Sequence, residues 1–441
     1  MKNKIAFISE HASPLAVLGG IDAGGQNVYV AEICKVLLRK GYQIDIFTRL
    51  DRPNQPSVVN WMPGIRVIYV KAGPAAQVPK ELLLGYMDEF TGCMLDFITE
   101  SGIQYDLIHA NFFMSGLVAS RIKEQLGIPY VITFHALGKI RMIHQKEKDA
   151  FPVARLEIEQ MIVDDADYII AECPQDQQDL VDHYQADLSK IKIIPCGFSA
   201  DEFYPQTKSK ARSKLGLPQS DLVLLQLGRI VPRKGIDNVI RCLKYLKDIP
   251  NVRLLVVGGS CETPDFENDS EFKRLLAIAK NEGVDDRVEF AGRRDRDQLK
   301  FYYQAADFFI TTPWYEPFGI TPLEAMACGT PVIGANVGGI KYTVAHKQTG
   351  FLVPPDDPRA LADAVREGIS CPDQYRLLCK NALKRVNEYF TWESVADDMS
   401  RLYAQVAQRP HTMPRYLLKL KRSNRKLTSR QSINAAAYVL R

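Results

Sequence analysis

Short apolar runs alternate with amphipathic stretches along most of the chain. The runs are rich in β-branched and aromatic residues, and each has the length of a buried strand. Two amphipathic stretches, 28–41 and 115–127, end on glycine, the usual residue just past a helix. The alternation predicts parallel sheets covered by helices on both faces. The expected strands occupy residues 4–10, 42–48, 66–70, 105–111, 130–136, 167–173, 191–197, 222–230, 252–260, 287–292, 307–312 and 330–335.

This alternation is interrupted once, at residues 196–221, which are polar and irregular and indicate a connection between domains. We therefore predict two doubly wound α/β domains in tandem, the first in residues 1–200 and the second in 201–385. Ligands of such sheets bind at the carboxyl ends of the strands. Two facing sheets would consequently form a cleft that holds the site.

The composition agrees with a soluble protein of more than one domain. The chain has 441 residues, of which 46% are hydrophobic and 24% charged. It contains no apolar run as long as a membrane span, and its first residues, MKNKIAFISE, lack the pattern of a secretory signal. None of the nine cysteines forms a CxxC pair. We expect reduced thiols and a cytoplasmic protein.

Positive charge is concentrated at the end of the chain. Residues 409–441 contain nine Lys or Arg and no Asp or Glu, whereas the whole chain has a net charge of +4, so the rest is slightly acidic. A basic tail of this kind is usually solvated. Its segment 415–426 also suits anionic lipid headgroups. The acidic body and the lack of a recognised module argue against nucleic-acid binding.

Two glycine-rich segments follow the first strands of the two domains. The glycines in residues 18–30 allow backbone amides to approach a diphosphate, with a plain glycine turn as the alternative. The long loop and its spacing do not fit the dinucleotide fingerprint. In residues 227–235, Arg229 and Lys234 bring two cations to the edge of the sheet. They suit a diphosphate leaving group, with a solvated basic loop as the alternative.

The strongest chemical signal is the segment TTPWYEPFGITPLEAMACGTPVI at 311–333. Glu316 lies in a loop among aromatic residues after a strand, as expected of a ligand contact. Glu324 lies three residues after Thr321, with proline between them, which predicts a capping box at the start of a helix. The start of a helix also attracts phosphate groups. A structural and a ligand-binding role are both open for Glu324.

Metal binding is weakly indicated. The Asp-x-Asp patterns at 165–167 and 295–297 lie at a helix-to-strand junction and in an exposed charged stretch, and the seven histidines have no metal-ligand spacing. We expect no essential metal or other cofactor. His135 differs, because it lies at the carboxyl end of an apolar strand, where active sites form.

Four motifs taken together resemble family 4 of the retaining glycosyltransferases. They are GGQNVYV, TFHALGK, LGRIVPRKG and EPFGITPLEAMACGTPVI, in this order and at fitting spacing, and the resemblance covers nearly all of residues 1–408. It is nearest to the branch of D-inositol 3-phosphate glycosyltransferases and sucrose-phosphate synthases. It implies the GT-B fold, two Rossmann-like domains that face each other across a cleft. It also implies that a helix in 386–408 crosses back onto the first domain.

The resemblance assigns a role in donor binding to residues in each motif. Arg229 and Lys234 would hold the diphosphate, Glu316 the donor sugar and Glu324 the ribose. His135 would meet the 6-hydroxyl of the sugar near the acceptor, and it joins Arg229, Lys234 and Glu316 in the expected catalytic set. The other implied donor contacts are Gly25 over the diphosphate, Arg293 at the base, and the backbone of Phe318, Gly319 and Ile320.

The acceptor side departs from the family pattern. The inositol-phosphate branch holds the phosphate of its acceptor with a lysine, a tyrosine, a threonine and an arginine. Local alignment keeps Lys80 and Arg155 but places Phe112 and Ala136 at the hydroxyl positions. The two retained cations support a phosphorylated or acidic acceptor, and the two lost hydroxyls argue against inositol phosphate itself. Ordinary surface charge is the alternative for both cations. We also assign Asn27 to the acceptor.

The resemblance leads to a functional hypothesis. The chain would be a retaining hexosyltransferase that uses a nucleotide diphosphate sugar, with UDP-sugar preferred, and a small phosphorylated sugar or polyol. One alternative keeps the donor chemistry but has a lipid-linked or polysaccharide acceptor at a membrane. Another is a nucleotide-sugar-binding protein without turnover.

Overall fold

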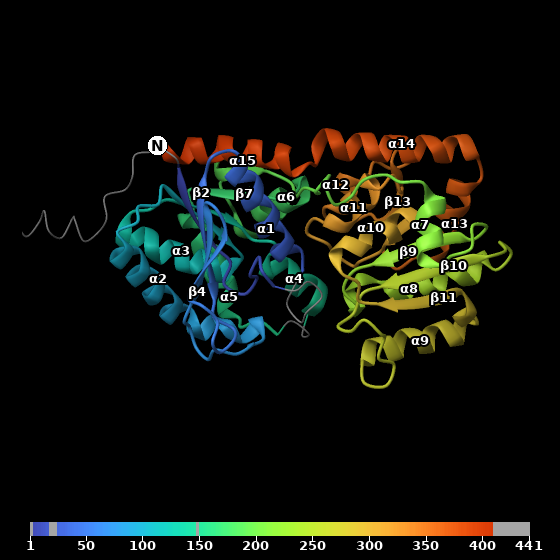
Figure 1. Ribbon diagram of the computed structural model, residues 1–441, viewed down its shortest axis with the longest axis horizontal. Helices are drawn as coiled ribbons and strands as arrows, with labels where there is room; N and C mark the ends of the chain where they lie inside the picture. Colours follow the sequence, from blue (N-terminus) through green and yellow to red (C-terminus); the bar gives the residue numbers. More distant parts are fainter. Residues whose placement is uncertain (1–2, 17–23, 147–149, 409–441) are drawn as a thin grey trace, which may run out of the picture.

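The chain forms two twisted sheets, each covered by helices (Figure 1). The computed structural model describes residues 3–16, 24–146 and 150–408. Part of the first glycine segment and the basic tail, for which we predicted diphosphate and lipid contacts, lie outside these residues. None of the helices in the described ranges is long and apolar enough to cross a bilayer.

The first sheet has eight strands in the order β3-β4-β2-β1-β5-β6-β7-β8. All neighbours are parallel except β3 and β4, which are antiparallel. Most of its strands are buried along nearly their whole length, which explains their apolar sequences. The strands are β1 (Lys4–Ile8), β2 (Gln43–Arg49), β3 (Val58–Met62), β4 (Ile65–Val70), β5 (Leu107–Asn111), β6 (Tyr130–Thr133), β7 (Tyr168–Ala171) and β8 (Ile191–Ile193).

The second sheet has six parallel strands in the order β11-β10-β9-β12-β13-β14. Its core also consists of aliphatic and aromatic side chains from the strands and the covering helices. The strands are β9 (Leu222–Leu227), β10 (Val252–Val257), β11 (Val288–Gly292), β12 (Phe308–Thr311), β13 (Val332–Ala335) and β14 (Gly350–Val353).

Helices follow the strands in both halves of the chain. Several begin at the residues that sequence rules favour: Asp269, Asp357 and Thr391 each cap a helix through the side chain. The helices are α1 (Gly25–Arg39), α2 (Met87–Ser101), α3 (Phe113–Leu126), α4 (Gly138–Gln145), α5 (Ala154–Asp165), α6 (Pro174–Tyr184), α7 (Lys208–Leu215), α8 (Ile236–Cys242), α9 (Ser270–Glu282), α10 (Arg296–Ala305), α11 (Ile320–Ala327), α12 (Ile340–Thr343), α13 (Pro358–Ile369), α14 (Pro372–Tyr389) and α15 (Trp392–Ala407).

The strand orders place a switch point in each sheet. In the first sheet the order reverses between β1 and β5, and in the second between β9 and β12. Loops after such strands diverge to opposite faces and leave a crevice at the carboxyl edge. The glycine segment follows β1, Arg229 follows β9 and Glu316 follows β12. The topology therefore brings these segments to the crevices.

Two long helices at the end of the described chain run along one side of both halves (Figure 1). Helix α14 packs against α11 and α13 of the second half, and α15 packs against α1 and β5 of the first. The side chain of Tyr403 on α15 also lies 2.7 Å, Oη to Nδ1, from the buried His109 of β5. The C-terminal helix thus completes the core of the first half.

The predicted fold class is confirmed, with three local corrections. The expected strands all form, but β3 and β14 were missed. Residues 196–221 are not irregular throughout, because they contain α7 and because Phe198 pairs with Thr391. The predicted domain boundary at 200 falls between the last strand of the first sheet and the first strand of the second, and it stays a prediction.

Candidate active site

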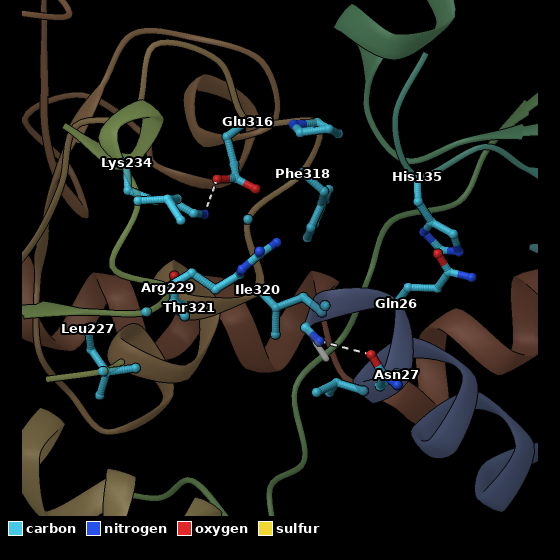
Figure 2. A pocket seen from close by; sticks show the side chains of 18 of the residues that line it. Gln26, Asn27, His135, Leu227, Arg229, Lys234, Glu316, Phe318, Ile320 and Thr321 are labelled. Atoms are coloured by element: carbon cyan, nitrogen blue, oxygen red, sulfur yellow. Dashed lines mark hydrogen bonds and ion pairs between the residues drawn. The ribbon is translucent and has the colours of Figure 1, made fainter. Parts of the chain in front are cut away.

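A cavity of about 530 Å³ lies between the two halves and is lined by loops from the carboxyl edges of both sheets. Figure 2 shows Arg229, Lys234 and Glu316 on one side, with His135 and Asn27 on the other. All ten residues that we predicted as donor or catalytic contacts line it: Gly25, His135, Arg229, Lys234, Arg293, Glu316, Phe318, Gly319, Ile320 and Glu324.

The two predicted diphosphate cations lie just after β9. Arg229 stands in the loop that leaves the strand, and Lys234 ends a short 3-10 turn, Pro232–Lys234. Lys234 Nζ donates a hydrogen bond to Glu316 Oε2, and Arg233 Nη1 lies 3.7 Å from the same oxygen. Burial lowers the pKa of Lys234 against the opposing charge of Glu316. Positive charge is thus gathered at one wall of the cavity.

Both the side chain and the backbone of Glu316 are fixed by contacts with neighbouring residues. Burial alone would raise its pKa, but Lys234 and Arg233 outweigh burial and hold the pKa below its usual range. Its backbone carbonyl accepts a hydrogen bond from Gly339 N at 3.1 Å. A Cβ atom at Gly339 would lie 2.3 Å from Phe318 Cα, so a glycine is needed for the loop to pack this closely. The carboxylate is fixed and ionised.

The predicted capping box at Thr321 and Glu324 is wrong. Helix α11 begins two residues earlier than expected, with Gly319 as its N-cap at φ 91° and no side-chain cap. Glycine adopts this conformation at no cost, so the chain turns into the helix before Thr321. The first backbone N–H groups of α11 consequently lack a side-chain partner and lie at the cavity wall.

Glu324 is instead engaged by two side chains from α10. Arg296 Nη1 donates to Glu324 Oε1 at 3.0 Å, and Tyr303 Oη donates to Glu324 Oε2 at 2.9 Å. Burial raises the pKa of Glu324, and the charge of Arg296 opposes that rise. The residue therefore faces the cavity from the first turns of α11 rather than capping it.

His135 is constrained on all sides just after β6. Its backbone has φ 57°, uncommon for a residue with a side chain. Nδ1 lies 3.1 Å from Glu172 Oε1, and Nε2 lies 3.1 Å from Asn111 Oδ1. The ring of Tyr29 meets the imidazole edge-on, with centroids 4.8 Å apart. This array presents a fixed imidazole to the cavity.

The three predicted acceptor residues have different surroundings. Lys80 and Asn27 line the cavity. The Asn27 side chain accepts from Gly24 N at 2.8 Å and donates to Ser13 O at 2.9 Å, so it also fixes the glycine loop. Arg155 is not among the lining residues and is only 2% exposed. Its predicted contact with an acceptor stays a prediction.

Arg155 is enclosed by its own neighbours. Nε donates to Glu159 Oε1 at 2.7 Å, and Nη2 donates to the carbonyl of Ala136 at 2.5 Å. The guanidinium carbon lies 4.9 Å from the ring centroid of Phe112 and is also close to Phe113 and Phe151. Phe112 and Ala136, the departures from the family pattern, line the cavity in front of it. The guanidinium supports the wall from behind.

Sequence reasoning missed several polar residues at the cavity, including two arginines and one glutamate. Arg141 on α4 and Arg296 on α10 line it, and Glu172 after β7 holds His135. Arg296 is the middle residue of the second Asp-x-Asp pattern, which we had examined only for metal binding. No group of three or more His, Cys, Asp or Glu suited to a metal occurs in the described part of the chain.

Comparisons with known proteins agree with this architecture. The family model described as Glycosyltransferase Family 4 matches residues 23–202, and that described as Glycosyl transferases group 1 matches residues 207–385. A D-inositol 3-phosphate glycosyltransferase of Corynebacterium jeikeium is 35% identical over 415 residues, which cover 92% of this chain and 98% of that protein.

Solved structures extend the likeness to three dimensions. A sucrose-phosphate synthase from Thermosynechococcus elongatus superposes with a TM-score of 0.84 at 36% identity, over 92% of this chain and 99% of that one. The Anabaena protein HepE in complex with UDP-glucose has the same fold, with a TM-score of 0.71 at 22% identity, over 91% of this chain and 99% of that one.

Proposed function

Since this chain belongs to glycosyltransferase family 4 and has the GT-B fold, we propose that it transfers a hexose, with retention of configuration, from a uridine diphosphate sugar to a small phosphorylated sugar or polyol. The relatives named above are an enzyme for an inositol phosphate and a synthase of a sugar phosphate. The Anabaena structure, of the same fold, contains UDP-glucose. These names give the classes of donor and acceptor that we propose.

The observation that carries the proposal is the pairing of cations and carboxylates on one wall of the cavity. Arg229, Lys234 and the N-terminus of α11 provide positive charge for a diphosphate. Glu316 and Glu324 stand beside them as acceptors for sugar hydroxyls. A carboxylate that accepts from hydroxyl groups and a cation that binds phosphate are the two requirements of a nucleotide-sugar site.

The opposite wall supports a phosphorylated acceptor. Lys80 and Arg141 line the cavity from the first half of the chain, and His135 lies at the same wall. Arg141 lines the cavity, whereas Arg155, the predicted acceptor cation, is not among the lining residues and binds Glu159. Two cations at the wall suit a phosphate group on the acceptor.

The state of the cavity carboxylates supports a front-face mechanism. Lys234 binds Glu316, and Arg296 and Tyr303 bind Glu324, which suits these carboxylates to hold hydroxyl groups of the donor rather than to attack the anomeric carbon. The departing diphosphate oxygen would take the acceptor proton while Arg229, Lys234 and α11 stabilise its charge. Among the described residues, the carboxylates that line the cavity are Glu172, Asp269, Glu316 and Glu324.

The test is the release of UDP from UDP-glucose, with and without a panel of sugar phosphates and inositol phosphates. We expect release to rise sharply with one phosphorylated acceptor, and NMR of the product to show the anomeric configuration of the donor. Slow hydrolysis that no phosphate accelerates would overturn the acceptor class. An inverted product would overturn the mechanism.

Variants of the diphosphate cations add a second test. Arg229→Ala and Lys234→Ala should each slow transfer by about a hundredfold or more, since each removes charge stabilisation of the leaving group. Arg253→Ala is the matched control, because Arg253 pairs with Asp221 and Glu289 outside the cavity. Turnover like that of the wild type in both cavity variants would contradict the assignment.

A further inference from the structure

Arg296, the first residue of α10, has the most constrained guanidinium at the cavity. Nε donates to Glu202 Oε2 at 2.6 Å, and Nη1 donates to Glu324 Oε1 at 3.0 Å. The guanidinium carbon lies 5.0 Å from the ring centroid of Phe203. Two edges and one face of the planar group are therefore fixed, an arrangement that the point charge of a lysine cannot reproduce.

Glu324 is fixed in turn by this arginine. With Arg296 on Oε1 and Tyr303 on Oε2 at 2.9 Å, each carboxylate oxygen receives one hydrogen bond from the protein. A carboxylate oxygen has two lone pairs, so each keeps one acceptor direction for a ligand. Because the carboxylate cannot rotate, these directions are set before the ligand arrives.

We propose that Arg296 is a positioning residue that orients Glu324 for recognition of the ribose hydroxyls of the donor nucleotide. This inference rests on the donor site of the proposed function. It assigns a role to a residue that lies outside the four motifs of the family resemblance. Arg296 does not need to touch the nucleotide, because it acts through the carboxylate.

The charges around the pair agree with this role. Burial lowers the pKa of Arg296, but Glu324, Glu202 and Glu32 raise it more, so the guanidinium stays a cation. Burial raises the pKa of Glu324, Arg296 and the hydrogen bond from Tyr303 lower it, and Glu202 adds to the rise. The nearby Cys328 thiol has its own pKa raised by burial and by Glu324, and so stays neutral.

The affinity for the donor should depend on the protonation state of Glu324. The ionised form of Glu324 accepts from the ribose hydroxyls, so donor affinity falls as the pH drops through its pKa. Removing Arg296 removes a cause that lowers this pKa. The acid limit of nucleotide binding, which is the pH below which affinity falls, should therefore be higher in Arg296→Gln. A merely structural role would not produce this change.

The experiment is calorimetric titration of UDP and 2′,3′-dideoxy-UDP into the full chain across a pH series. We expect the wild type to prefer UDP. Arg296→Gln should lose roughly tenfold to a hundredfold in affinity for UDP and little for the dideoxy compound, the range for a hydrogen bond to a charged group. Arg296→Lys should keep the acid limit near that of the wild type and lose part of the preference, because it retains the charge without the planar fork.

The control is Arg274→Gln, since Arg274 also bridges two carboxylates, Glu271 and Asp237, but does so outside the cavity. Its preference and acid limit should match those of the wild type. If Arg296→Gln does not fold, Arg296→Lys decides, and an unchanged preference in that variant overturns the proposal.

The two nucleotides distinguish a failure of the proposed donor site from a failure of the role of Arg296. No binding of UDP, or equal affinity of the wild type for both nucleotides, would overturn the donor site itself. A preference in the wild type that Arg296→Gln retains, with losses equal for both compounds and an unmoved acid limit, would overturn the role of Arg296 alone. A lost preference with a shifted acid limit supports both.

Discussion

At the scale of single residues, the contact between Lys234 and Glu316 bears on stability and on the donor site that we propose. Each group is largely buried and compensates the charge of the other. Removing one partner of a buried ion pair leaves the other unpaired, which is usually more destabilising than removing both. A donor that enters this site must therefore compete with an interaction that the protein already makes.

This reasoning predicts a non-additive pair of variants. Lys234→Met and Glu316→Gln should each lower the free energy of unfolding by about 1–3 kcal/mol. The first removes the nearer of two cations from Glu316, and the second leaves Lys234 without its carboxylate partner. The double variant should be less destabilised than the sum of the two. All three should lack transfer activity. Urea unfolding and UDP release measure the two effects, and fully additive destabilisation would contradict the coupling.

Residues within motifs were predictable, and residues that act through their neighbours were not. Arg229, Lys234, Glu316 and Glu324 reach one cavity as their motifs predicted. Arg155 does not reach it, because Glu159 one helical turn later binds the guanidinium. That spacing of four is visible in the sequence and is the signal that could have found the pair.

At the scale of elements, short and partly exposed segments were the ones missed. Strand β3 has intermediate or exposed burial at every position and pairs antiparallel at the edge of its sheet, so its sequence lacks a buried apolar run. Strand β14 has four residues. The start of α11 was misplaced because the φ of Gly319, not a capping side chain, decides where the helix begins.

The close contact between the Glu316 loop and the segment before α12 predicts that Gly339→Ala impairs the site. The added Cβ would meet the Phe318 backbone at 2.3 to 2.7 Å, so the loop that carries Glu316 must move. We expect kcat/KM for the donor to fall about a hundredfold, the order of effect of a 1 Å displacement of a binding group.

Gly350→Ala is the matched control for this prediction. Its Cβ would collide with the backbone of Val332 inside the second sheet, at 2.0 Å, away from the Glu316 loop. It should lower the melting temperature while the folded fraction keeps its kcat/KM. Equal kinetic losses per folded molecule in both variants would contradict a specific role for Gly339.

At the scale of the whole molecule, the connection between the two halves meets the C-terminal helix pair at one point. Trp392 at the start of α15 is 1% exposed and packs against Gly197, and its ring lies edge-on to Tyr29 with centroids 5.7 Å apart. Tyr29 in turn contacts His135. The sequence predicted a connection and a helix here, but not that they touch, because contacts between residues so distant in the chain leave no local pattern.

This junction predicts that Gly197→Ala weakens both stability and catalysis. The new Cβ would lie 2.8 Å from the backbone nitrogen of Trp392 and equally close to its indole ring, and a backbone atom in a packed core does not yield. We expect a loss of about 1–3 kcal/mol in unfolding free energy, as for other overpacked sites. Because the displaced indole packs on Tyr29, and Tyr29 on His135, kcat should also fall.

Gly85→Ala is the control, because no atom lies within 4 Å of its added Cβ, and it should change neither the free energy of unfolding nor kcat. If Gly197→Ala lost stability at unchanged kcat, the junction would hold the two halves together without any influence on the imidazole.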